Sequence, residues 1–332
     1  MLRVVFETDD VARVRVAAEP DFLWEIANSV QTLQRRDGAA VFGAWRRWAR
    51  PRLSGSSRLL PALLPPTGYS PDFLTPTAGD RRTPEAAVDT LRSTPKRQLT
   101  ADLARLAATR ELPSWTSDLA HGELPALHRL GEAFQSYDAQ AVAPFWRRIH
   151  AHIDADRALR MNTLLDGGAE GLLSGLGPRF RWRWPVLEAD YPVDRTLELG
   201  GRGLTLLPSF FCWPTPVTLA DPSRTPVLVY PVQHEPDWEG GRAGAASRGR
   251  GQPLGALLGQ TRAALLRYAC IGGSTGELAR RLGVSTPAVS QHVAVLREAG
   301  LLITVRRDGR AFHTATAEGR ALLRCGERGG VR

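Results

Sequence analysis

Residues 274–298 of this sequence contain the signals of two short helices, separated by one glycine. Ser274 is followed three residues later by Glu277, the arrangement of a capping box that starts a helix. Gly283 is the residue type that most readily adopts the left-handed conformation at a helix end. Ser285 is a second N-cap, and Pro287 suits the first turn of a second helix. The sequence therefore predicts two short helices joined by a tight turn.

The second predicted helix has one apolar face and one small polar face. Val289, Val293 and Leu296, at spacings of four and three, predict the buried face. The opposite face carries Thr286, Ser290, Gln291 and His292. This pattern is typical of a helix-turn-helix. Small side chains let such a helix enter the major groove of DNA, where Gln pairs with base edges and Ser bonds phosphate or base.

A β-hairpin is predicted directly after these helices. Residues 301–305 and 311–316 have strand character, and Arg306-Arg-Asp-Gly-Arg310 between them is a tight turn with three arginines. A closing helix is expected over residues 317–325. The whole segment thus predicts a winged helix, whose wing arginines are well placed for phosphate or the minor groove.

The charge of the chain is concentrated at the same end. Residues 242–332 contain 15 arginines, no lysine and five acidic residues, a net charge of +10, whereas residues 1–241 carry −1. A GC-rich genome explains arginine over lysine but not why the excess lies at one end. The asymmetry indicates a polyanionic partner, most often nucleic acid.

Residues 278–302 resemble the ArsR family of bacterial winged-helix repressors. The matching motifs are Val289-Ser-Gln-His292, Leu296-Arg-Glu-Ala-Gly-Leu301 and the wing turn described above, and the resemblance covers under a quarter of the chain. It implies a repressor that binds double-stranded DNA, and a homodimer is expected because one such helix contacts only a short half-site. The candidate DNA-binding residues are Ser285, Thr286, Pro287, Ser290, Gln291, His292, Arg306, Arg307 and Arg310.

The sequence departs from the family at the known metal sites. Ser274-Thr-Gly276 stands where the arsenical-sensing members have Cys-Val-Cys, and residues 317–325 lack the Asp/His pairs of the zinc-sensing members. We therefore expect no metal site and no cofactor. Typical members are much shorter than this chain, which carries a long N-terminal region as in some actinobacterial regulators. Any small-molecule effector is expected to bind there.

The N-terminal region predicts a mixture of helices and short strands. The helices are expected over residues 21–33, 85–92, 97–110 and 123–160. Strands are expected over residues 4–6, 11–16, 186–191, 196–199, 204–207 and 227–230. Gly200-Gly-Arg-Gly203 is interpreted as a hairpin turn between two of these strands. Residues 53–84, dense in Pro and Ser, show no usable periodicity.

The predicted fold is therefore α+β, with two domains. Residues 1–235 form a mixed helical and small-sheet domain for dimerisation, effector sensing or both. Residues 236–253, rich in Gly, Ser and Arg, form a flexible linker, and residues 254–325 form the winged helix. The winged helix is expected to open with one helical stripe: Leu254, Leu257, Leu258, Leu265, Leu266 and Ala269.

Other candidate sites are weaker. Trp146, Trp182, Trp184, Trp213 and Trp238 either line a ligand pocket or, more commonly, belong to the core. His150 and His152 lie two apart on a predicted helix, so they face different sides and do not predict a metal site. Cys270 fits a small buried hydrophobe better than a redox sensor. No local catalytic signature is present.

The sequence thus predicts a sequence-specific transcriptional regulator rather than an enzyme. No apolar run reaches the roughly 18 residues of a membrane span, and acidic residues occupy the start of the chain, so we expect a cytoplasmic protein. Two alternatives stay open. In one, the N-terminal domain is an enzyme that the winged helix delivers to DNA, and in the other the winged helix is a protein adaptor.

Overall fold

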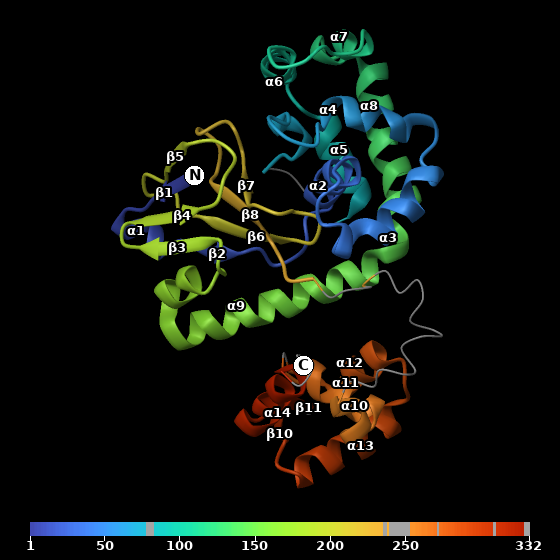
Figure 1. Cartoon of the computed structure of the whole chain (residues 1–332), viewed down its shortest axis with the longest axis vertical. Coiled ribbons are helices and arrows are strands. Elements are labelled where there is room, and N and C mark those ends of the chain that lie inside the picture. Colours follow the sequence, from blue (N-terminus) through green and yellow to red (C-terminus); the bar gives the residue numbers. More distant parts are fainter. Residues whose placement is uncertain (78–82, 235–237, 239–252, 271, 308–309, 329–332) are drawn as a thin grey trace. The chain divides into compact units, whose positions relative to one another are not determined.

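The computed structural model describes residues 1–77, 83–234, 238, 253–270, 272–307 and 310–328 (Figure 1). The chain divides into two compact units, residues 1–239 (unit 1) and 240–332 (unit 2). Unit 1 combines helices with two small sheets, and unit 2 is a winged helix, so the α+β fold class is confirmed. None of the helices that the structure describes is long and apolar enough to cross a membrane.

Unit 1 contains a helical part whose core is strongly aromatic. Its helices are α1 (Thr8–Val11), α2 (Phe22–Gln34), α3 (Ala39–Ala49), α4 (Leu60–Leu63), α5 (Pro84–Arg92), α6 (Lys96–Ala107), α7 (Trp115–Ala120), α8 (Leu124–Tyr137) and α9 (Trp146–Ser174). The N-cap of α2 is Asp21, whose carboxylate accepts hydrogen bonds from the backbone N–H of Leu23 and Trp24. Phe42, Trp45 and Phe210 are among the fully buried side chains of this core.

Two four-stranded sheets complete unit 1. The first has the order β3 (Phe180–Arg183), β4 (Val186–Ala189), β1 (Leu2–Val5), β5 (Arg195–Glu198), and the second has the order β2 (Arg15–Val16), β6 (Thr205–Ser209), β8 (Val227–Pro231), β7 (Val217–Thr218). β1 is antiparallel to β4 and parallel to β5. β6 is parallel to both β2 and β8.

The predicted hairpin at Gly200-Gly-Arg-Gly203 is wrong, because β5 and β6 belong to different sheets. The segment carries the chain from one sheet to the other. Gly203 has a φ of 72°, and a Cβ there would lie 2.5 Å from the carbonyl oxygen of Arg13. Its backbone N–H donates to the buried carboxylate of Asp10 at 2.7 Å. A glycine is required here by a close approach of two backbones rather than by a turn between paired strands.

Three further expectations about unit 1 need correction. The predicted strand over residues 11–16 is only β2, because Glu7 and Asp10 form a capping box that starts α1 just before it. The predicted helix over 123–160 is two helices, since Pro144 follows a π turn at residues 138–142 and lies in a 3-10 turn at residues 143–145. Trp238, assigned to the linker, is buried in the aromatic core, and its indole N–H donates to the carbonyl of Val41 at 2.7 Å.

Helix α9 connects the helical part of unit 1 with the sheets (Figure 1). Its first turns bury Ile149 in the aromatic core, whereas Leu172 and Leu173 lie in the core of the first sheet. Between them the backbone bends at Gly168, whose φ is 59° and ψ −158°. The bend lets the last turns of α9 fold back on the turn at Thr163, where a Cβ on Gly171 would lie 2.8 Å from a carbonyl oxygen.

Unit 2 contains a three-stranded sheet and helices packed on one apolar core. Its elements are α10 (Pro253–Leu258), α11 (Gln260–Tyr268), β9 (Gly273–Ser274), α12 (Thr275–Leu282), α13 (Thr286–Glu298), β10 (Leu302–Arg307), β11 (Arg310–Ala315) and α14 (Ala317–Arg328). The sheet order is β10, β11, β9. Leu266, Leu278 and Val289 are fully buried and bring α11, α12 and α13 together.

The single opening helix expected for this unit is instead two helices. Gly259, with a φ of 85°, separates α10 from α11. Leu265, Leu266 and Ala269 are buried as expected, but Leu257 is exposed. The remainder of the predicted linker, residues 236–253 apart from Trp238 and the start of α10, lies outside the described residues.

Candidate nucleic-acid interface

The first helix of the motif is fixed by the capping box seen in the sequence. The hydroxyl of Ser274 accepts a hydrogen bond from the backbone N–H of Glu277, and the Glu277 carboxylate accepts one from the backbone N–H of Ser274 at 2.8 Å. The backbone N–H of Ser274, and after it the Ser274 hydroxyl at 2.9 Å, donate to this carboxylate and hold the pKa of Glu277 below its usual range. The helix ends at Gly283, whose φ is 66°. The predicted start and end of α12 are confirmed.

The second helix, α13, begins within three residues of that glycine. The hydroxyl of Ser285 accepts a hydrogen bond from the backbone N–H of Ala288, and Pro287 lies in the first turn, where no helix hydrogen bond is lost. Val284, between the helices, is half-buried against the core of the unit. The geometry is that of a helix-turn-helix.

The outer face of α13 presents the predicted small polar side chains. Thr286, Pro287, Ser290 and Gln291 are exposed, whereas His292 is half-buried at the border with the apolar face. The Ser290 hydroxyl donates to the backbone carbonyl of Thr286 at 3.1 Å, so its oxygen faces outward as an acceptor. Val289, Val293 and Leu296 are buried on the inner face, as the spacing predicted.

The wing is the antiparallel pair of β10 and β11. The register places Leu302 opposite Ala315 and Arg307 opposite Arg310, so these two arginines occupy the last paired positions before the turn. Arg306 is exposed. The turn residues Asp308 and Gly309, and the side chains of Arg307 and Arg310, lie outside the described residues.

A buried histidine that the sequence did not single out braces the wing against the motif. His313 on β11 is 4% exposed. One ring nitrogen lies 2.8 Å from the hydroxyl of Thr275 at the start of α12, and the other lies 2.9 Å from the hydroxyl of Thr304 on β10. Burial, aided by Arg297, lowers its pKa. A neutral imidazole therefore fixes the wing strands to the N-terminus of α12.

Further arginines surround the motif. Arg280 and Arg281 on α12 and Arg297 on α13 are exposed. The predicted set of DNA-binding residues did not include these three arginines. The excess of arginine in this unit was the sequence signal that could have identified them. Together with Arg306 they give this unit positive charge on both motif helices and on the wing, which suits a phosphate backbone.

Other sites considered in the sequence give little chemistry here. Among the described residues no three His, Cys, Asp or Glu side chains are grouped so that they could hold a metal ion. Cys270 is half-buried against the core of unit 2, and its thiol lies 3.6 Å from the carbonyl of Leu266.

The five tryptophans do not form one pocket. Trp213 and Trp238 pack around Phe42 in the aromatic core, and Trp146 stacks on Phe22 while donating to Asp138 at 3.0 Å. Trp182 and Trp184 line a cavity together, and the other three do not contribute to it.

A comparison with known families agrees with this geometry. The sequence profile of the MarR family matches residues 260–311, from the start of α11 through the motif to the second wing strand. This confirms a winged helix-turn-helix domain of the regulator type in unit 2, and indicates DNA-binding transcriptional regulation. No curated protein matches the chain, and no solved structure matches it.

Proposed function

We propose that the protein is a sequence-specific transcriptional regulator that binds double-stranded DNA with α13 and the wing. The observation that carries this proposal is the outer face of α13, where Thr286, Ser290 and Gln291 are exposed on a helix that begins at the N-cap Ser285 and packs its other face into the core of unit 2. In this arrangement α13 enters the major groove. Gln291 reads base edges, Ser290 accepts a hydrogen bond from a base, and Ser285, Thr286, Pro287 and His292 border the contact.

The arginines supply the part of the affinity that does not depend on sequence. Arg306, Arg307 and Arg310 of the wing contact phosphates or the minor groove, and Arg280, Arg281 and Arg297 add to the positive field. Each phosphate contact releases counterions, so binding weakens as the salt concentration rises.

The finer assignment is a repressor of the ArsR type. The motifs over residues 278–302 support it, and Ser274-Thr-Gly276 in place of the cysteine pair supports a regulator without the arsenical site. A homodimer fits because one motif helix contacts only a short half-site. Unit 1 is regulatory rather than catalytic in this proposal, and it provides dimerisation, effector binding or both.

The decisive experiment is a gel shift of the full chain on its own upstream DNA, with excess competitor and a salt series. A discrete band that survives competitor and weakens steeply with salt supports the proposal. If excess competitor DNA abolishes the band, sequence-specific recognition is contradicted. The enzyme and adaptor hypotheses are then favoured.

Two substitutions separate the two kinds of contact. Gln291→Ala is expected to weaken binding to the cognate site by about 1–3 kcal/mol and to relax its specificity. Arg306→Ala is expected to weaken binding to every sequence. It is also expected to reduce the slope of the logarithm of the affinity against the logarithm of the salt concentration by about 1, the value for one phosphate contact. Arg110→Ala, which removes an exposed arginine from unit 1, is the matched control and leaves both quantities unchanged. If Gln291→Ala bound all sequences as well as the wild type, α13 would not be the recognition helix.

A further inference from the structure

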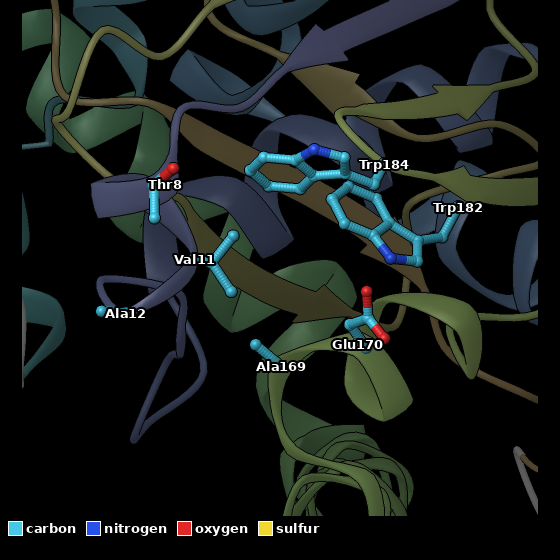
Figure 2. A pocket seen from close by; sticks show the side chains of 7 residues that line it. All are labelled: Thr8, Val11, Ala12, Ala169, Glu170, Trp182 and Trp184. Atoms are coloured by element: carbon cyan, nitrogen blue, oxygen red, sulfur yellow. The ribbon is translucent and has the colours of Figure 1, made fainter.

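A cavity of about 430 Å³ lies within unit 1, between α1, the end of α9 and strand β3 (Figure 2). Its lining consists of Thr8, Val11, Ala12, Ala169, Glu170, Trp182 and Trp184. The volume falls within the range of small-molecule sites, roughly 300–1,000 Å³. Figure 2 shows the two indole rings next to each other and the Glu170 carboxylate turned toward the same space.

The walls of this cavity are held by contacts outside it. The helix α1 is fixed by its capping box and by buried Asp10, which accepts the backbone N–H of Gly203. Trp182 packs edge-on against Phe6, with ring centroids 5.0 Å apart. The indole of Trp184 lies next to it at 6.2 Å and is 53% exposed. Trp182 is therefore held in place without a ligand, whereas Trp184 offers a half-exposed ring beside it.

The bend in α9 brings the only charged group of the lining to this wall. The backbone leaves the helical path at Gly168. The next two residues, Ala169 and Glu170, therefore do not continue the axis of the preceding helix. Arg160, paired with Asp156 at 2.8 Å, donates a hydrogen bond to the carbonyl of Gly175 and so fixes the segment after the bend. The backbone that carries Glu170 thus has a defined place beside the cavity.

No cation neutralises Glu170 within the part of the chain that the structure describes. Glu170 is exposed and has no hydrogen bond or ion pair with any other described residue. Arg181 and Arg183 flank Trp182 in β3. Because successive side chains of a strand point to opposite faces, these two arginines lie on the face away from Trp182. Arg181 is moreover 3.8 Å from Glu188.

An unpaired carboxylate beside two indole rings favours the binding of a positively charged ligand. A positively charged group is attracted both by the carboxylate and by the negative faces of the aromatic rings. An anion is repelled by both, and a neutral ligand gains only burial against Val11, Ala12 and Ala169. We propose that this cavity binds a small organic cation, an ammonium group on an apolar body, between Glu170 and the Trp182–Trp184 pair. Its use as an effector site rests on the proposed regulatory function, but the binding itself does not.

The test is isothermal titration calorimetry of the full chain without DNA, with benzyltrimethylammonium as the probe. Saturable binding in the micromolar to millimolar range is expected for the wild type. Glu170→Gln is expected to weaken it about tenfold, and Trp184→Ala about fivefold, with Trp184→Phe recovering part of the loss. Glu132→Gln removes an exposed carboxylate from α8 and is expected to leave the affinity unchanged. Phenylacetate, of similar size and opposite charge, is expected not to bind.

Three outcomes overturn the proposal: no saturable binding of the cation, equal binding of phenylacetate, or an affinity that Glu170→Gln leaves unchanged. Glu170 and Trp184 are both exposed, so their variants are expected to fold, and a thermal unfolding midpoint equal to that of the wild type checks this. Because no DNA is present, failure of the DNA-binding proposal does not affect the result. A gel shift with and without the probe then measures the regulatory consequence separately.

Discussion

The ends of the two motif helices in unit 2 are fixed by local bonds, whereas several loops of unit 1 are held by bonds to distant residues. In unit 2 each motif helix is bounded by residues within a few positions of its ends: Ser274 with Glu277, Gly283, and Ser285 with Ala288. In unit 1 buried carboxylates bind backbone groups far away in the chain. Glu25 on α2 accepts the N–H of Phe210 and Phe211 at 2.9 and 3.1 Å, about 185 residues on.

The same device recurs in unit 1. The Asp72 carboxylate accepts the backbone N–H groups of Ala220 and Asp221 at 2.9 and 2.7 Å. Asp10 does so for Gly203, and Asp102 for Phe73 at 2.8 Å. A buried acceptor satisfies loop amides that no strand or helix satisfies. The stability of unit 1 is therefore expected to depend on single buried charged residues and on pH. The stability of unit 2 is expected to depend on its helix-capping residues and glycines.

The largest effect is expected from the buried pair on α9. Asp156 and Arg160 are 4% and 5% exposed, and Asp156 also accepts the hydroxyl of Tyr230 at 2.5 Å. Arg160→Met leaves the carboxylate buried without its cation, so unit 1 is expected to lose about 3–5 kcal/mol of stability. All nine tryptophans lie in residues 1–239, so urea unfolding followed by tryptophan fluorescence measures this unit alone.

The neighbouring pair supplies the control for this prediction. Arg157 and Asp154 lie 3.1 Å apart on the same helix, but both are partly exposed. Arg157→Met is expected to change stability by less than about 1 kcal/mol, because water solvates the remaining carboxylate. Equal losses in the two variants would mean that α9 is sensitive to any arginine substitution rather than to the buried charge.

The next effect concerns pH. Burial raises the pKa of Glu25 from 4.5 to about 7, although hydrogen bonds from Ser209, Phe210 and Phe211 oppose the shift. Between these values the unfolded chain releases a proton that the folded unit keeps, so stability falls as the pH rises. The total loss from this group is about 3 kcal/mol, complete above pH 7.

Glu25→Gln is expected to remove this part of the pH dependence. The measurement is the difference in the free energy of unfolding of unit 1 between wild type and variant at several pH values from 5 to 8. The difference is necessary because burial also raises the pKa of Asp138 to about 6 and lowers that of His234 to about 4. A constant difference across this range would contradict the raised pKa of Glu25.

The contrast between the units also decides what the sequence alone could predict. Start and end signals of α12 and α13 depend on neighbouring residues, so capping and periodicity placed both helices and the wing correctly. The same reasoning placed α2, whose cap Asp21 is local, and α5. It failed at Gly203 and Trp238, because the partners of those residues, Asp10 and Val41, are distant in the chain and no local pattern reveals them.

The candidate site shows the same limit at smaller scale. The polar face of α13 followed from helical spacing: Thr286, Ser290 and Gln291 are exposed as predicted, whereas His292 is half-buried. The brace at His313 depends on three separate elements, and the pairing of Trp182 and Trp184 with Glu170 depends on the bend at Gly168. Neither could be derived from spacing, since each requires the strand register and the path of the chain between sheets.

Two glycines of unit 2 provide a matched test of local control. A Cβ at either Gly283 or Gly276 would have no heavy atom within 4 Å, so neither substitution by alanine creates a clash. Gly283 has a φ of 66° and Gly276 lies inside α12. Gly283→Ala is therefore expected to destabilise unit 2 by about 1 kcal/mol, and Gly276→Ala to stabilise it by up to about 0.5–1 kcal/mol. Hydrogen exchange of the α12 and α13 amides measures both, and effects of the same sign would contradict the conformational explanation.

The smallest effect is expected from the second N-cap. Ser285→Ala removes the acceptor for the backbone N–H of Ala288 and is expected to cost about 0.5–1 kcal/mol, because the amide is exposed enough to bind water instead. Ser290→Ala, one turn further into α13, removes a hydroxyl that bonds only the helix carbonyl of Thr286 among the described residues, and is expected to leave stability unchanged. On DNA the order is expected to reverse: under the proposed function the Ser290 hydroxyl bonds a base, so Ser290→Ala weakens binding more than Ser285→Ala, which loses only a border contact and the stability of the first turn. Hydrogen exchange measures the stability of α13 in the two variants, and gel shifts measure their affinity for DNA. If the same variant showed the larger loss in both measurements, the distinction between a residue that stabilises α13 and one proposed to bind DNA would be contradicted.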